Sequence, residues 1–159
     1  MPDSVDYGAR REALKRRFLP VEGTGDGPVM TGGVDHLALI SSDLEATIAF
    51  YSELLGMRLT TVIPNRDEPS STHIFLDMGG GNLLAFFDFP KHGPERTVRG
   101  VGSMHHLALK AAPESYGAVI ARLRSRGHPF SLHGSEEQGS VYVRDPDGIL
   151  VEITTGYDL

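Results

Sequence analysis

Two histidines and one glutamate of this sequence could bind a divalent metal ion together. His36 in "DHLAL" and His106 in "HHLAL" occupy the same place in two matching stretches, and Glu152 lies in the apolar run "ILVEI". Two imidazoles and one carboxylate form a facial triad, which leaves coordination positions open and suits Fe(II) or a related divalent ion. Because the chain of 159 residues contains no cysteine, metal binding would depend on such nitrogen and oxygen ligands.

Each of these residues also has an ordinary structural explanation. A single histidine on a strand is more often packed in a core, and a buried glutamate is more often paired with an arginine. The two histidines, however, are related by a repeat, and Glu152 is a carboxylate that is costly to bury unless it is paired or bound to a metal. Together these features favour metal binding over the structural explanation.

The elements that would position the three residues occur twice in the chain. Residues 34–56 and 104–127 each contain an alternating strand, a short link, an amphipathic helix and a terminating glycine. Further strands follow each helix and end in a hairpin. Both halves therefore read β-α-β-β-β, and we expect modules at about 34–89 and 103–155.

Local signals mark the start of the first helix and the turn of the last hairpin. Ser42 with Glu45 forms a capping-box pattern. The sequence at 145–148, Asp-Pro-Asp-Gly, fits a type I turn followed by a glycine bulge. This turn predicts that Tyr142 pairs with Glu152 on the same face of the hairpin.

Strand alternation assigns the two repeat-related histidines to one face of each sheet. Leu37 and Leu39 would pack under the helix that follows, which leaves His36 on the opposite, concave face. The same alternation places His106 on the concave face of the second sheet and directs His105 to the other side.

Composition and charge exclude several classes of protein. The chain has a net charge of −6, 40% apolar and 23% charged residues, and no apolar run of the roughly 18 residues that a membrane span needs. We expect a cytoplasmic protein with no membrane or nucleic-acid partner. We also expect a partly helical arm at 1–33, where the basic cluster forms a solvated helix face, and a single domain at 34–159.

Three stretches, "VDHLALISSDLEATIAFYSELLGMRL", "HHLALK" and "VYVRDPDGILVEI", resemble the vicinal oxygen chelate superfamily. This superfamily includes glyoxalase I, bleomycin- and fosfomycin-resistance proteins, epimerases and extradiol dioxygenases. The resemblance implies an α+β, glyoxalase-like fold of two paired βαβββ modules around a metal-centred cavity. It implies metal positions at His36, Ala85, His106 and Glu152. Alanine cannot supply the fourth ligand usual in glyoxalase I and the epimerases.

A His-His-Glu set without a fourth ligand resembles that of extradiol dioxygenases. Their local pattern matches "HGSEEQGSVYVRDPDGILVE", and it implies that His133 and Tyr142 position substrate and oxygen. Those enzymes carry a further histidine near the first module's last turn. Asn82 stands there instead and cannot transfer a proton, and His73 on the preceding strand is a candidate replacement.

The sequence thus predicts a metal-dependent enzyme that acts on a small molecule with adjacent oxygens, most simply an extradiol-dioxygenase-like oxygenase. We expect one divalent metal ion bound by His36, His106 and Glu152, with Fe(II) favoured and Mn, Ni or Zn possible, and catalytic roles for Tyr142 and His133. A glyoxalase-like lyase or isomerase and a non-catalytic bleomycin-resistance-type binding protein are the alternatives. We expect a homodimer, and the modules could pair within one chain or swap between two.

Overall fold

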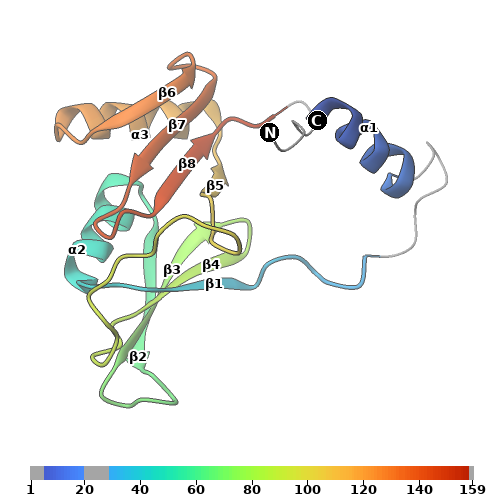
Figure 1. Cartoon of the computed structure of the whole chain (residues 1–159). Helices are drawn as coiled ribbons and strands as arrows, with labels where there is room; N and C mark the ends of the chain where they lie inside the picture. Colours follow the sequence, from blue (N-terminus) through green and yellow to red (C-terminus); the bar gives the residue numbers. More distant parts are fainter. Residues whose placement is uncertain (1–5, 20–28, 158–159) are drawn as a thin grey trace. The chain divides into compact units, whose positions relative to one another are not determined.

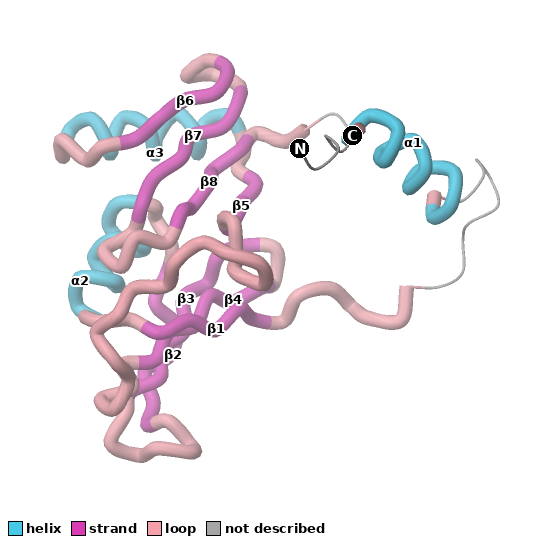
Figure 2. Tube along the Cα trace, viewed as in Figure 1, coloured by secondary structure: helices cyan, strands magenta, loops and turns pink. Residues whose placement is uncertain are grey.

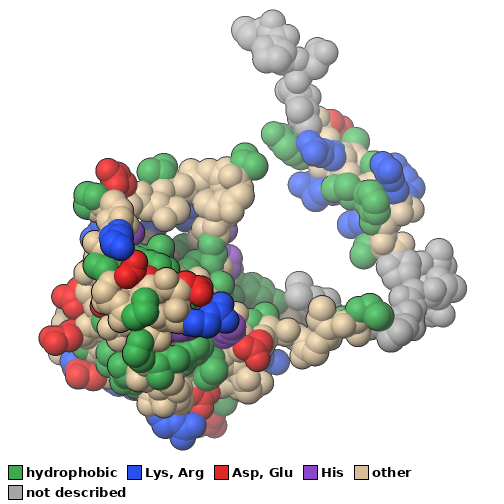
Figure 3. All heavy atoms as spheres, turned by 90° about the horizontal axis from the view of Figure 1, so that it is seen from below, with side chains coloured by type: hydrophobic (Ala, Val, Ile, Leu, Met, Phe, Trp, Pro, Cys, Tyr) green, Lys and Arg blue, Asp and Glu red, His purple; other side chains and the backbone are tan. Residues whose placement is uncertain are grey.

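The computed structural model describes residues 6–19 and 29–157. Contacts divide the chain into two compact units, Met1–Gly33 and Val34–Leu159. The first contains helix α1 (Tyr7–Phe18), which Asp6 caps by accepting a hydrogen bond from the Ala9 amide. This helix buries none of its residues, and its lysine and arginine side chains are spread over its exposed surface (Figure 3).

The second unit contains two modules of the same order (Figure 1). The first comprises β1 (His36–Ile40), α2 (Leu44–Ile48), the π-helix η1 (Ala49–Leu54), β2 (Arg58–Pro64), β3 (Thr72–Gly79) and β4 (Asn82–Phe87). The second comprises β5 (Leu107–Lys110), α3 (Pro113–Ser125), β6 (Phe130–Gly134), β7 (Gly139–Arg144) and β8 (Leu150–Thr154). A long loop joins β4 to β5 (Figure 2). The predicted α+β fold of two βαβββ modules with an N-terminal helix is confirmed.

The two sheets have the same topology. Their strand orders are β1-β4-β3-β2 and β5-β8-β7-β6, and in each the first strand pairs in parallel with the last. The remaining pairs are antiparallel. As a result, β1 and β5 are both edge strands, each bonded to a neighbouring strand on one side.

The helix of the first module, α2, begins one residue later than the capping-box pattern predicted. Its N-cap is Asp43, whose carboxylate accepts a hydrogen bond from the Ala46 amide. Ser42 is unavailable because both its amide and its hydroxyl donate to the Asp147 carboxylate, at 3.0 and 2.5 Å. The serine thus joins the first module to the hairpin turn of the second.

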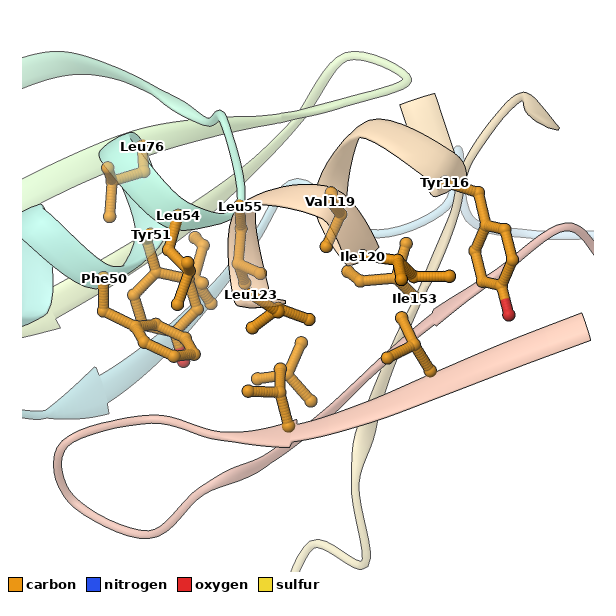
Figure 4. Close-up of a cluster of buried hydrophobic side chains, with 14 of the residues drawn as sticks. Phe50, Tyr51, Leu54, Leu55, Leu76, Tyr116, Val119, Ile120, Leu123 and Ile153 are labelled. Atoms are coloured by element: carbon orange, nitrogen blue, oxygen red, sulfur yellow. The ribbon is translucent and has the colours of Figure 1, made fainter. Parts of the chain in front are cut away.

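One hydrophobic core serves both modules. The helices α2–η1 and α3 face each other with their apolar side chains between them, among them Tyr51, Leu54 and Leu123 (Figure 4). Strands of both sheets also contribute to this core, for example Leu84 of β4 and Val151 of β8. Each sheet therefore turns one face toward the shared core and the other face away from it.

The described helices include none that is long and apolar enough to cross a membrane.

Candidate metal centre

The second sheet brings together two of the three predicted metal ligands. The Nε2 atom of His106 lies 2.9 Å from Oε2 of Glu152, whose side chain is almost completely buried. Glu152 lies on β8 between core residues and points to the opposite face. It pairs with Tyr142 of β7, as the turn sequence predicted.

This close contact fits two ligands of one metal ion better than an ion pair. Although Nε2 of His106 is near, the buried Oε2 atom of Glu152 has no hydrogen-bond partner. Two ligand atoms at about 2.1 Å from one ion and at right angles to each other lie about 3 Å apart. A buried carboxylate oxygen without a donor is costly, and a bound cation would remove that cost. The site residues thus fit a divalent metal ion.

The other oxygen of Glu152 is held by a residue that the sequence analysis missed. The Tyr157 hydroxyl donates to Oε1 of Glu152 and lies 3.2 Å from the Tyr142 hydroxyl. Burial acts to raise the pKa of Glu152, but hydrogen bonds from neighbouring hydroxyl groups and the nearby His106 outweigh it and lower the pKa. The carboxylate is therefore ionised at neutral pH, as a metal ligand must be.

His105 does not point away from His106 as alternation predicted. The Nδ1 atoms of the two rings lie 2.7 Å apart. The prediction is wrong because β5 begins only at Leu107, so neither histidine belongs to the regular strand. One Nδ1 donates and the other accepts, which leaves Nε2 of His106 directed at Glu152.

His36 on the first sheet is held in the same way. Its Nδ1 atom lies 2.6 Å from the Asp35 carboxylate, and the ring makes an edge contact with Phe75. Asp35 and His105 take equivalent positions in the repeat, each directly before a predicted ligand. A carboxylate or imidazole on Nδ1 fixes the ring and its tautomer so that Nε2 is left for a metal.

The face around His36 is apolar and aromatic. Ala85 is fully buried there, and its methyl group offers no atom that could bind a metal. The rings of His73 and Phe87 stack with centroids 3.7 Å apart, and those of Phe75 and Phe89 extend the group. We call these four side chains the aromatic wall. Burial and, second, the neighbouring His36 lower the pKa of His73.

A single chain does not assemble the whole predicted triad. Among the described residues, no three histidine, aspartate or glutamate side chains lie close enough together to hold one ion. His36 lies on the first sheet, and His106 and Glu152 belong to the second. Both groups lie on sheet faces that turn away from the shared core.

The other predicted site residues have different surroundings. Tyr142 shares the face of Glu152, and hydrogen bonding to Tyr157, followed by burial and Glu152, raises its pKa to about 12. The exposed His133 lies on the same face, because it pairs with Ser140, two residues before Tyr142. Asn82 donates to backbone carbonyls of its own turn.

The second unit also contains a cavity of about 660 Å³. It is lined by the end of β1, the loop before β5 and the β7–β8 turn, for example by Ile40, His105 and Asp147. None of His36, His106 and Glu152 lines it. The cavity therefore lies along β1 and borders the candidate metal centre only through His105, whose ring holds His106.

The fold is that of a vicinal oxygen chelate protein. Residues 33–153 match the sequence profile of the Glyoxalase/Bleomycin resistance protein/Dioxygenase superfamily. The chain belongs to this superfamily, as its motifs indicated.

Individual relatives differ in function. Biphenyl-2,3-diol 1,2-dioxygenase of Paraburkholderia xenovorans is 29% identical over 161 residues, which cover 96% of this chain and 50% of that protein. Virulence protein STM3117 of Salmonella typhimurium is 28% identical over 76% of this chain and 82% of its own length. The chain thus spans about half the length of the biphenyl-diol dioxygenase.

Solved structures share the fold. The fosfomycin resistance protein FosX of Listeria monocytogenes, complexed with Mn(II) and sulfate, superposes with a TM-score of 0.58 at 22% identity, covering 81% of this chain and 96% of FosX. A glyoxylase/bleomycin resistance protein/dioxygenase domain from Frankia sp. EAN1pec gives a TM-score of 0.68 at 19% identity, covering 80% and 99%. Members of the superfamily include metal-dependent enzymes.

Proposed function

We propose that this protein is a metal-dependent enzyme of the extradiol dioxygenase type, acting on a small substrate with two adjacent oxygens. The observation that carries the proposal is the buried Oε2 of Glu152, which has no hydrogen-bond partner and lies 2.9 Å from Nε2 of His106. The absence of a donor at Ala85 supports the oxygenase over a standard glyoxalase I, because three ligands leave more positions open for substrate and oxygen. The similarity to biphenyl-2,3-diol 1,2-dioxygenase supports the same class.

We further propose that two copies of the chain complete each metal centre. Within one chain His36 does not lie with His106 and Glu152, because their sheet faces both turn away from one shared core. The edge strands β1 and β5 offer backbone groups that a second chain can pair with. A twofold dimer that places β1 beside the partner's β5 would form this strand pairing twice. Each site would then contain His106 and Glu152 with His36 of the partner subunit.

The side chains around this centre suit a planar substrate. A bound divalent ion would act as a Lewis acid and lower the pKa of a chelating substrate hydroxyl. Tyr142 keeps its proton at neutral pH because its pKa is about 12, so its neutral hydroxyl can accept a hydrogen bond from a substrate hydroxyl. The aromatic wall next to His36 offers ring faces on which an aromatic substrate can stack. His133, on the face of Tyr142, would contact the substrate farther from the ligands.

Fe(II) is the proposed ion, with Mn, Ni or Zn as alternatives. A two-histidine, one-carboxylate set with open positions is the arrangement typical of non-haem Fe(II) oxygenases.

One observation favours a glyoxalase-like lyase or isomerase as the second candidate. The Nε2 atom of His73 is buried without a hydrogen-bond partner, and its lowered pKa keeps the ring neutral at pH 7. A neutral imidazole near the metal centre could accept a proton from a carbon next to a carbonyl group.

Anaerobic reconstitution with Fe(II) tests the proposal. We expect oxygen consumption with at least one catechol from a substituted series, and none with the Glu152→Ala variant. Turnover of 1,2-dicarbonyl compounds without oxygen consumption would instead support the lyase or isomerase. Tight binding of an aromatic drug by a protein that takes up no metal would support the bleomycin-resistance-type binding protein and contradict the enzyme.

A further inference from the structure

We propose that Tyr157 is a positioning residue for the metal ligand Glu152. The inference rests on the proposed metal centre and assigns a role to a residue outside both modules' strands. Tyr157 follows β8 by three residues, and its hydroxyl donates to Oε1 of Glu152. The neighbouring oxygen, Oε2, is the one that lies beside His106.

The hydrogen bond determines which carboxylate oxygen is available. The torsion that rotates a glutamate carboxylate is broad, so a free carboxylate exchanges its two oxygens easily. The hydrogen bond from Tyr157 fixes Oε1 and leaves Oε2 beside Nε2 of His106. The carboxylate is thereby oriented for the metal before the metal arrives, which reduces the cost of binding.

The same hydroxyl also orders the proton of Tyr142. Tyr157 has one hydroxyl proton and gives it to Glu152, so toward Tyr142, at 3.2 Å, it can only accept. The Tyr142 proton therefore points at Tyr157, and the remaining lone pairs of Tyr142 are free. Tyr142 would accordingly meet a substrate hydroxyl as an acceptor.

Tyr157 is placed to serve the site more than the fold. Tyr157 is 55% exposed and does not belong to the shared hydrophobic core. Removing its hydroxyl would consequently leave the folded structure largely unchanged. A loss of metal affinity in such a variant would report on the carboxylate and not on general unfolding.

Isothermal titration of the 159-residue chain with Mn(II) tests this role, with Tyr157→Phe as the variant. We expect Mn(II) affinity to fall about 10- to 100-fold, with the unfolding temperature of the metal-free protein unchanged. The visible spectrum of bound Co(II) should also shift, because the ligand oxygen is no longer fixed.

Tyr116→Phe is the matched control. It removes a tyrosine hydroxyl from the same module, where it donates to the Ser135 carbonyl at 3.0 Å. We expect this variant to lose thermal stability and keep its Mn(II) affinity. Unchanged affinity and Co(II) spectrum in Tyr157→Phe, or an equal loss of affinity in Tyr116→Phe, would overturn the positioning role alone. A wild-type protein that binds none of these ions would overturn the proposed metal centre as well.

Discussion

The two modules share one topology but offer different chemistry. The first sheet presents one predicted ligand, His36, next to Ala85 and the aromatic wall. The second presents His106 and Glu152 with the hydroxyl groups of Tyr142 and Tyr157. The two copies of the unit thus share one topology, but one presents an aromatic, largely apolar face and the other a polar face. A centre between the two kinds of sheet can hold an aromatic ring on one side and direct hydrogen bonds from the other.

The residues that hold the two histidines also differ. Asp35 places a carboxylate on Nδ1 of His36, whereas His105 places an imidazole on Nδ1 of His106. A charged partner makes the stronger hydrogen bond and holds the ring more firmly. His36 should therefore depend more on its neighbour than His106 does.

The largest effect is expected when the second module loses a ligand. His106→Ala should abolish stoichiometric binding of Fe(II) and Mn(II), because Glu152 would be left as the only ligand of its sheet. Metal content after anaerobic reconstitution measures this. His92→Ala is the control, since His92 lies in the loop between the modules and contacts a backbone carbonyl. Full metal content in His106→Ala would remove that residue from the site.

Giving the first module the carboxylate it lacks should be the next largest change. Ala85 is completely buried among apolar residues, so Ala85→Glu should lower the free energy of unfolding of the metal-free protein by about 3 kcal/mol or more. Saturating Mn(II) should restore part of that loss if the new carboxylate reaches the metal. Denaturation with and without Mn(II) makes the comparison. If Mn(II) raises the free energy of unfolding of the variant no more than that of the wild type, position 85 does not face the metal.

The unequal histidine partners predict unequal effects. Asp35→Ala should weaken Mn(II) binding by about 10- to 100-fold, and His105→Ala should weaken it less. Titration calorimetry on both variants gives the ratio. A larger loss in His105→Ala would reverse the assignment of the stronger partner.

The smallest effect concerns the contact between the modules. The Tyr51 hydroxyl donates to Asp145 at 3.1 Å, and burial is the main reason that the pKa of Asp145 is raised. The folded state therefore binds this proton more tightly than the unfolded state, so Asp145 stabilises the protein most at acid pH, and this contribution is lost as pH rises through the raised pKa.

Asp145→Asn removes that titration while keeping an acceptor for the backbone amides of the turn. We expect the variant to lie within about 1 kcal/mol of the wild type at pH 7. The free energy of unfolding of the wild type should increase relative to that of the variant as pH falls toward 4. Urea denaturation at both pH values measures the difference. If the free energy of unfolding of the wild type instead falls relative to that of the variant on acidification, the raised pKa is contradicted.

The sequence predicted what depends on regular strands and on the repeat. Alternation placed His36 opposite the packed leucines, and the turn sequence paired Tyr142 with Glu152, because both follow from strand geometry. It could not predict the position of His105 or the contact of Tyr157, since both lie outside the strands. Nor could it decide how the modules meet, because that depends on which face of each helix joins the shared core.

Mixing two inactive variants tests the centre shared between chains most directly. His36→Ala and Glu152→Ala should each bind no metal alone. After the two are unfolded together and refolded, a centre built from two chains leaves one intact site in every mixed dimer. Metal content should then recover to about one quarter of the wild-type value, because half of the dimers are mixed. No recovery, with mixed dimers shown to form, would mean that the modules pair within one chain and would contradict the account.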